Sequence, residues 1–194
     1  MLSYLALGDS YTVGEGVPLY DSFPYQTVQA LRRQGHAFMA PEIVARTGWT
    51  TGELLAALDR TRLLPRYDWV SLLIGVNNQY RGLEPDQYGR QFEDLVLRSQ
   101  RLTVSRVVVL SIPDWGVSPF AARGDRDPRE ISRDIDVFNG VAEAISRRHR
   151  LPFLDLTSHS RTARGFVADG LHPAAETYRY WAQQLSKHIL SDPG

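Results

Sequence analysis

The sequence of 194 residues contains no cysteine. This absence excludes disulfides, thiolate-bound metal sites and cysteine nucleophiles, so any nucleophile in the chain reacts through oxygen or nitrogen. It is also typical of a reducing compartment, and the first apolar run leads straight into Gly8-Asp9-Ser10 without the pattern of a secretory signal. We therefore expect a cytoplasmic protein, or the mature form of a secreted or periplasmic protein whose leader has been removed.

Long apolar runs and an excess of one charge are absent as well. No segment approaches the roughly 20 apolar residues that span a bilayer, so we expect no membrane span. Lys plus Arg and Asp plus Glu number 22 each, and a neutral chain has no long-range field that attracts nucleic acid or an anionic membrane surface. The expected partner is a small molecule or carbohydrate bound at a local site, and composition predicts nothing about the oligomeric state.

The motifs of common cofactors are incomplete or missing. The fragment Gly14-Glu15-Gly16 begins like a dinucleotide fingerprint but lacks the third glycine, and no Gly-Lys-Ser/Thr phosphate loop occurs. No close set of histidine and acidic residues has the spacing of metal ligands. We expect neither a nucleotide cofactor nor a metal.

Short β-rich apolar runs alternate with longer stretches of helical period, which predicts a parallel sheet with helices on both faces. With 43% hydrophobic residues, residues 1–194 are expected to form one domain. The predicted strands lie near Leu2–Leu7, Phe38–Ala45, Trp69–Ile74, Arg106–Ser111 and Phe153–Leu156. The predicted helices cover Phe23–Arg33, Thr51–Arg62, Glu84–Leu102, Pro128–Arg150 and the segment after Pro173. Between them, Pro113–Asp127 is expected to be an irregular loop that overhangs a site.

Four positions in this pattern fall where ligands of open parallel sheets bind, at the carboxyl ends of the strands. Ser10 follows the first predicted strand, Gly48 the second and Asn77 the third, and His172 comes after the fifth. A serine attacks when a base takes its proton, the base needs an acid partner to fix its tautomer, and the oxyanion needs donors. Asp169, three residues before His172, is close enough to be that acid.

In order along the chain, Gly8-Asp9-Ser10, Gly48, Gly75-Val76-Asn77 and Asp169-Gly170-Leu171-His172 resemble the sequence blocks of the SGNH hydrolases, also called the GDSL esterase/lipase family. The resemblance implies a flavodoxin-like three-layer α/β/α sandwich with a five-stranded parallel sheet in the order 2-1-3-4-5. It also implies Ser10 as nucleophile, His172 as general base and acid, and Asp169 as the residue that orients His172. The implied oxyanion hole consists of the backbone amides of Ser10 and Gly48 and the side-chain amide of Asn77.

Several residues leave alternatives open. The third block of the family usually ends in aspartate, and here Asn78 takes that place, so whatever the carboxylate anchors must be held differently. Asp155 is the rival of Asp169 as orienting acid, and Asp9 is interpreted as an acceptor for turn amides. Asp114 is a candidate pocket residue that could equally cap a turn. The other histidines are expected at the surface, namely His36, His149, His159 and His188.

Together these residues predict a serine esterase that forms an acyl-serine intermediate. The predicted loop offers few large apolar groups, and Tyr11, Trp49 and Tyr80 are expected to form a small aromatic rim. Short-chain acyl esters, including acetylated carbohydrates, are therefore the expected substrates. A lysophospholipase, lipase or thioesterase, or an acyltransferase with the same triad, stays open. A non-catalytic binding module is disfavoured because the serine, histidine, aspartate and asparagine are all present.

Overall fold

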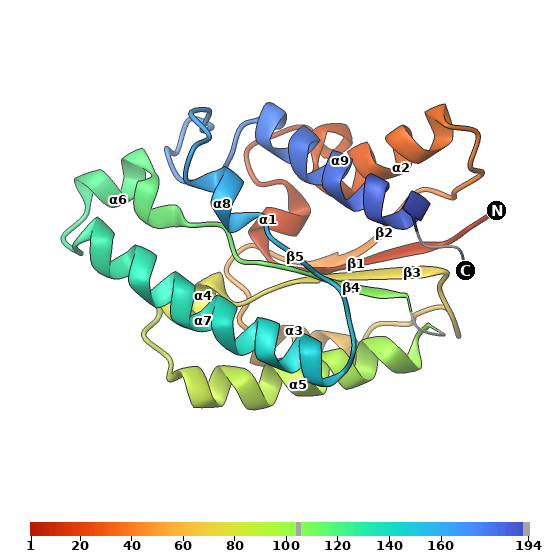
Figure 1. Ribbon diagram of the computed structural model, residues 1–194, viewed down its shortest axis with the longest axis horizontal. Coiled ribbons are helices and arrows are strands. Elements are labelled where there is room, and N and C mark those ends of the chain that lie inside the picture. Colours follow the sequence, from red (N-terminus) through yellow and green to blue (C-terminus); the bar gives the residue numbers. More distant parts are fainter. Residues whose placement is uncertain (104–105, 192–194) are drawn as a thin grey trace.

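The computed structural model describes residues 1–103 and 106–191. A five-stranded parallel sheet lies between two layers of helices (Figure 1). The strands are β1 (Tyr4–Gly8), β2 (Glu42–Ala45), β3 (Trp69–Leu73), β4 (Val107–Leu110) and β5 (Phe153–Leu154). Their order in the sheet is β2-β1-β3-β4-β5, with every neighbouring pair parallel. This order confirms the predicted three-layer fold.

The central strands β1 and β3 are buried along their whole length. Helices cover both faces of a parallel sheet, so these strands are continuous apolar runs and not alternating ones. Ser71 is the one polar residue within β3, and its hydroxyl lies 2.7 Å from the hydroxyl of Tyr4 on β1. That hydrogen bond satisfies two buried polar groups inside the core.

Five long helices form the two outer layers (Figure 1). One face of the sheet is covered by α2 (Phe23–Arg33) and α9 (Ala175–Ser191), and the other by α3 (Thr51–Leu58), α5 (Pro85–Arg101) and α7 (Pro128–Arg148). Each amphipathic helix turns its apolar stripe towards the sheet. On α9 the buried large side chains follow the predicted spacing, namely Tyr178, Trp181, Leu185 and Ile189. None of the helices within residues 1–103 and 106–191 is long and apolar enough to cross a bilayer.

Shorter helical segments connect the layers and gather where the strands end (Figure 1). They are α1 (Ser10–Val13), η1 (Leu19–Asp21), α4 (Val76–Tyr80), η2 (Trp115–Val117), α6 (Pro119–Arg123) and α8 (Thr157–Ser160). The predicted irregular loop over Pro113–Asp127 is thus wrong, because η2 and α6 occupy most of it. Asp114 accepts a hydrogen bond from the Gly116 amide at 2.8 Å and Ser118 accepts one from the Ala121 amide at 3.1 Å, so each segment has its own N-cap.

Most other predicted elements differ from the structure by one or two residues at an end, and larger differences occur before Glu42 and after Leu58. Phe38 contacts the sheet only through an isolated bridge to Leu2, so the regular strand starts at Glu42. The helix predicted over Thr51–Arg62 ends at Leu58.

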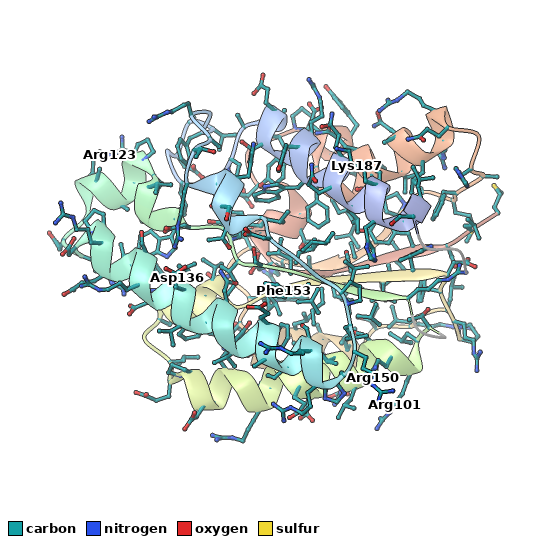
Figure 2. The ribbon with its side chains drawn as sticks, in the orientation of Figure 1. Arg101, Arg123, Asp136, Arg150, Phe153 and Lys187 are labelled. Atoms are coloured by element: carbon teal, nitrogen blue, oxygen red, sulfur yellow. The ribbon has the colours of Figure 1, made fainter. Side chains whose placement is uncertain are left out.

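The helix predicted to reach Arg150 ends at Arg148 (Figure 2 labels Arg150). Arg150 adopts the left-handed conformation, with a φ of 56°, and the Leu151 amide returns to the Ser146 carbonyl at 2.8 Å. This geometry terminates a helix.

Candidate active site

Ser10, His172 and Asp169 converge at the carboxyl end of β1. Ser10 is the first residue of α1, and its Oγ lies 2.9 Å from Nε2 of His172. The other ring nitrogen, Nδ1, lies 2.6 Å from Oδ2 of Asp169. Ser10 and His172 are only 5% and 7% exposed, whereas 42% of the Asp169 side chain is exposed. The structure therefore aligns the predicted nucleophile, base and acid in the order that proton transfer requires.

The Asp169 carboxylate is fixed by the turn that carries it. Its Oδ1 accepts hydrogen bonds from the amides of Leu171 at 2.7 Å and His172 at 3.0 Å, while Oδ2 faces the imidazole. Partial burial raises the pKa of Asp169, but the hydrogen bonds from the His172 ring and from these amides lower it more, so it lies below its ordinary value. An ionised Asp169 accepts a hydrogen bond from the Nδ1–H group of His172, which leaves Nε2 free to accept the proton of Ser10.

Helix α6 covers this turn from outside. The Phe120 amide donates to the Gly170 carbonyl at 2.9 Å, and Nη2 of Arg123 donates to the Asp169 carbonyl at 3.3 Å. Figure 2 labels Arg123 on α6. This contact could not be predicted from the sequence, because 46 residues separate Arg123 from Asp169 and no local pattern joins them.

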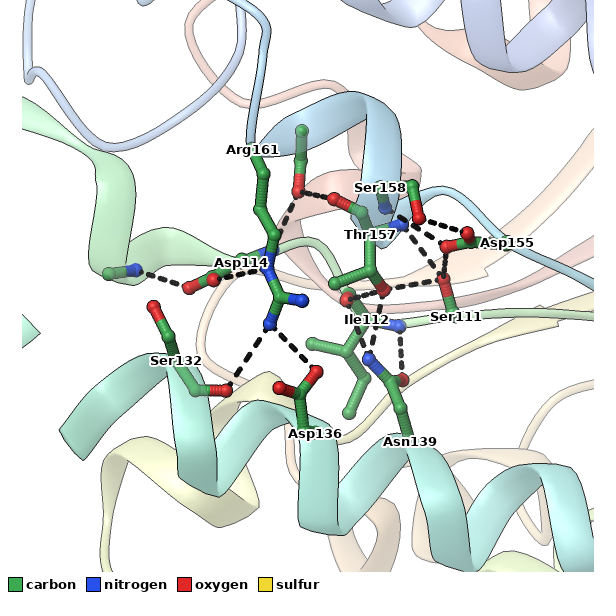
Figure 3. Close-up of polar contacts among 12 residues, drawn as sticks. Ser111, Ile112, Asp114, Ser132, Asp136, Asn139, Asp155, Thr157, Ser158 and Arg161 are labelled. Carbon is green, nitrogen blue, oxygen red and sulfur yellow. Dashed lines mark hydrogen bonds and ion pairs between the residues drawn. The ribbon is translucent and has the colours of Figure 1, made fainter. Parts of the chain in front are cut away.

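Asp155, the rival acid, belongs to a different polar network (Figure 3). Its carboxylate accepts hydrogen bonds from the amide and hydroxyl of Ser158 and from the hydroxyl of Ser111. Partial burial raises the pKa of Asp155, and these hydrogen bonds lower it below its ordinary value. It is Asp169, and not Asp155, that contacts the Nδ1 atom of His172.

Asp114 anchors a turn instead of lining the cavity beside Ser10. Its side chain is completely buried and pairs with Nε of Arg161 at 2.8 Å, and Arg161 also reaches Asp136 on α7 at 2.7 Å (Figure 3). Burial lowers the pKa of Arg161, but its two carboxylate partners raise it above its ordinary value. Of the two roles expected for Asp114, the structure therefore supports the turn cap, and its carboxylate fastens η2 to α7 and α8.

A cavity of about 200 Å³ opens beside Ser10, and we refer to it as the Ser10 cavity. Gly48 and Asn77, the other predicted oxyanion donors, both line it. Within the described residues, the backbone amides of Ser10 and Gly48 have no hydrogen-bond acceptor. Nδ2 of Asn77 donates one hydrogen bond to the Trp49 carbonyl at 2.9 Å, which leaves its second N–H available. Three unused donors thus surround one small space next to the serine.

Asn78 is fully buried and holds the start of α3 through Thr51. Its Oδ1 accepts from the Thr51 amide at 3.0 Å, and its Nδ2 donates to the Thr51 hydroxyl at 2.7 Å. That hydroxyl then donates to Oε1 of Gln91 at 2.6 Å. An aspartate at this position could accept hydrogen bonds from both the amide and the hydroxyl of Thr51. The hydroxyl would then donate to the aspartate and no longer to Gln91. With asparagine at position 78, the Thr51 hydroxyl can donate to Gln91, so the hydrogen bonds that hold the start of α3 also reach α5.

The aromatic groups of the Ser10 cavity differ from the predicted rim. Tyr80 is 49% exposed at the mouth, as predicted, but Trp49 does not line the cavity. Tyr11 lines it from a buried position, with its ring 5.6 Å from that of His172. Trp115 and Phe120 from the corrected loop complete the wall, and Nε1 of Trp115 donates to Gln79 at 2.8 Å.

The other histidines are less exposed than predicted, since only His36 is fully at the surface. His149 lies 2.7 Å from Glu93, His159 stacks on Tyr180 at 3.7 Å between ring centroids, and His188 packs edge-on against Trp69. None of these contacts reaches the Ser10 cavity. Among the described residues, no three histidine or acidic side chains lie close enough together to hold a metal ion.

Asp9 supports the turn before Ser10, as predicted. Its Oδ1 accepts from the Tyr11 amide at 3.0 Å, while its Oδ2 is buried without a hydrogen-bond partner within the described residues. Burial raises the pKa of Asp9 to about 7, against the opposing effect of backbone amides that include those of Tyr11 and Gly75. Folding therefore shifts Asp9 towards its protonated form relative to an exposed aspartate.

This raised pKa predicts a pH-dependent effect of Asp9→Asn on stability. A carboxyl group whose pKa is higher in the folded state stabilises the fold fully below its unfolded-state pKa of about 4. This stabilisation is lost as the pH rises through the folded-state pKa of about 7. The asparagine side chain has no charge to desolvate, so the melting temperature of the variant relative to wild type should increase by on the order of 5 °C between pH 4.5 and pH 8. Calorimetry at both pH values measures it. Asp155→Asn is the control, because a lowered pKa gives no such increase, and a difference for Asp9→Asn that is independent of pH would contradict the prediction.

The fold and this site together define the class of protein. A parallel α/β sheet that carries a serine, a histidine and an aspartate in hydrogen-bonded order at its carboxyl edge is typical of serine ester hydrolases. The sequence matches the GDSL-like lipase/acylhydrolase family over residues 6–180, and the chain belongs to that family. It is a serine ester hydrolase of the SGNH type. No curated protein sequence matches the chain.

Solved structures with the same fold include several lipolytic proteins. A lipase/acylhydrolase from Enterococcus faecalis has a TM-score of 0.79 and 21% identity, with 97% of this chain and 95% of that chain covered. A G-D-S-L family protein from Veillonella parvula has a TM-score of 0.80 and 13% identity, with 99% and 100% covered. Axe2, an acetylxylan esterase from Geobacillus stearothermophilus, has a TM-score of 0.72 and 18% identity, with 98% and 95% covered.

Proposed function

We propose that this protein hydrolyses short-chain acyl esters, including acetylated carbohydrates, through an acyl intermediate on Ser10. The observation that carries the proposal is the small Ser10 cavity, whose volume of about 200 Å³ adjoins the Ser10–His172 pair. Small-molecule sites commonly measure roughly 300–1,000 Å³, so this one is smaller than most. Its apolar wall consists of Val76, Tyr80, Trp115, Phe120 and Leu171.

The proposed reaction has two halves. Ser10 Oγ attacks the ester carbonyl as its proton passes to Nε2 of His172, and the oxyanion accepts hydrogen bonds from the Ser10 and Gly48 amides and from Asn77. The carbon–oxygen bond to the alcohol then breaks, and the alcohol leaves with the proton from His172. In the second half, water attacks the acyl carbon, its proton passes to His172, and the carboxylic acid leaves as Ser10 regains its proton.

Cavity size supports a short acyl group over a fatty one. Each methylene gains roughly 0.8 kcal/mol only where it contacts apolar surface. The five apolar wall residues cover a few methylenes, and beyond them a long chain would extend past the half-exposed Tyr80 into water. The Geobacillus stearothermophilus protein with the same fold is named an acetylxylan esterase, which makes acetylated xylo-oligosaccharides the first natural substrates to test.

Acyl-chain preference tests this proposal. Over a series of nitrophenyl esters, kcat/KM is expected to be greatest from acetyl to butyryl and to decline by octanoyl. Acetate release from an acetylated xylo-oligosaccharide is the second measurement, and added alcohols reveal whether acyl transfer competes with hydrolysis. A maximum at decanoyl or longer, or faster turnover of a lysophospholipid than of any short ester, would contradict the short-acyl assignment.

A further inference from the structure

The Gly48 amide sits in a tight turn whose second residue, Thr47, donates a hydrogen bond from its hydroxyl to Glu15. The Trp49 amide donates to the Arg46 carbonyl at 3.1 Å, and Gly48 at the third position of this turn has a φ of +85°. Thr47, at the second position, does not have a positive φ, so the turn is of type II. A type II turn changes to type I by rotation of its central peptide, and here that peptide carries the Gly48 N–H. The Gly48 N–H therefore belongs to the peptide group that reorients most easily in this turn.

Three side chains in or directly after α4 hold the backbone that follows the Gly48 amide, from the Gly48 carbonyl to the Thr51 amide. Asn77 donates to the Trp49 carbonyl at 2.9 Å, and Asn78 accepts from the Thr51 amide at 3.0 Å. Arg81, directly after α4, donates from Nη2 to the Gly48 carbonyl at 2.5 Å. Of these three contacts, the one from Arg81 is the only one made to Gly48 itself.

Few side chains other than that of Arg81 lie close to Gly48. Apart from Gly48 and its two neighbours in the chain, a Cβ atom placed on Gly48 would find a single heavy atom of the described residues within 4 Å, the Nη2 of Arg81 at 3.7 Å. The guanidinium is itself held by Glu53, whose Oε2 lies 3.3 Å from Nη1 and which also closes the capping box of α3 with Thr50. Arg81 thus links the turn to two helices that are fixed independently of it.

We infer that Arg81 is a positioning residue, whose hydrogen bond to the Gly48 carbonyl keeps the Gly48 amide in place beside Ser10 and Asn77. The inference rests on the proposed function, which assigns this amide to the oxyanion. Arg81 contacts neither Ser10 nor His172 and does not line the Ser10 cavity, so its effect is exerted through Gly48. Donors act on the transition state only when they are aimed in advance, and a displacement of about 1 Å can cost on the order of a hundred-fold.

Arg81→Ala is expected to lower kcat by roughly 10- to 100-fold on an acetyl ester with KM changed less than about three-fold, since the oxyanion forms only in the transition state. Arg81→Lys keeps one donor and the charge and should recover part of the loss. One control should stay near wild type. Arg98→Ala removes an exposed arginine paired with Asp59 on the surface.

A kcat for Arg81→Ala equal to that of wild type would overturn the inference, and so would an effect confined to KM, which would make Arg81 a substrate-binding residue. A second measurement does not depend on turnover. In ¹⁵N-labelled protein, Arg81→Ala should shift or broaden the amide signal of Gly48, whereas Arg98→Ala should not. If the wild-type protein turned over no ester, the proposed function would fail. The position of the Gly48 amide would then be tested by its NMR signal alone, and an unchanged signal in Arg81→Ala would overturn the inference about Arg81.

Discussion

Replacing Ser10 with alanine is expected to lower kcat by about a million-fold, and His172→Ala should lower it by a similar amount. Ser10 Oγ and His172 Nε2 lie 2.9 Å apart and share a single proton transfer, so either change removes the same step. The double variant should consequently be little slower than each single variant. The small remaining rate would come from the donors around the Ser10 cavity and from substrate binding.

Steady-state hydrolysis of an acetyl ester measures these effects, and a fluorophosphonate probe should label wild-type Ser10 and leave Ser10→Ala unlabelled. Ser99→Ala is a matched control, because this buried hydroxyl on α5 donates to the Leu95 carbonyl at 2.8 Å and has no other hydrogen-bond partner in the described part of the chain. Its kcat should stay within about three-fold of wild type. Losses that add in the double variant would show that Ser10 and His172 do not act as a unit.

The sheet and its long helices could be predicted because their signals are local. On α9, Tyr178, Trp181, Leu185 and Ile189 recur every three or four residues and all become buried. The buried strands β1 and β3 are apolar throughout, apart from Ser71, so composition alone finds them. Strand order is different, since it depends on which strands pair and was implied only by the resemblance of the four sequence blocks.

The contacts of Arg81 and Asp114 could not be predicted, because they join charged residues to parts of the chain that are distant in sequence. Arg81 and Gly48 are 33 residues apart, and Asp114 and Arg161 are 47 residues apart. A charged side chain on a short helix has the same sequence signal whether it points into water or reaches a carbonyl. One of the three expected rim residues was wrong for a related reason, since adjacency in sequence placed Trp49 beside Gly48, whereas Tyr11 and Tyr80 line the Ser10 cavity and Trp49 does not.

The choice between Asp169 and Asp155 illustrates the same limit, and a substitution can test it. Asp169→Asn is expected to lower kcat on the order of ten-thousand-fold while the protein stays folded, as in the serine-protease case of the same relay. The asparagine oxygen can keep the hydrogen bonds from the Leu171 and His172 amides, which now go to Oδ1. Its NH₂ group then faces Nδ1 of His172, which favours the tautomer with the proton on Nε2. That tautomer cannot accept the proton of Ser10.

Measurement of kcat on an acetyl ester, together with the melting temperature, tests both halves of this expectation. Asp155→Asn is the matched control, because Asp155 bonds to Ser111 and Ser158 and not to His172. It should change kcat by less than about three-fold. The reverse pattern, with a large loss for Asp155→Asn and a small one for Asp169→Asn, would transfer the role of orienting acid to Asp155. A large fall in melting temperature for Asp169→Asn would instead show that its carboxylate mainly stabilises the turn, because the tautomer argument requires that the turn stay intact.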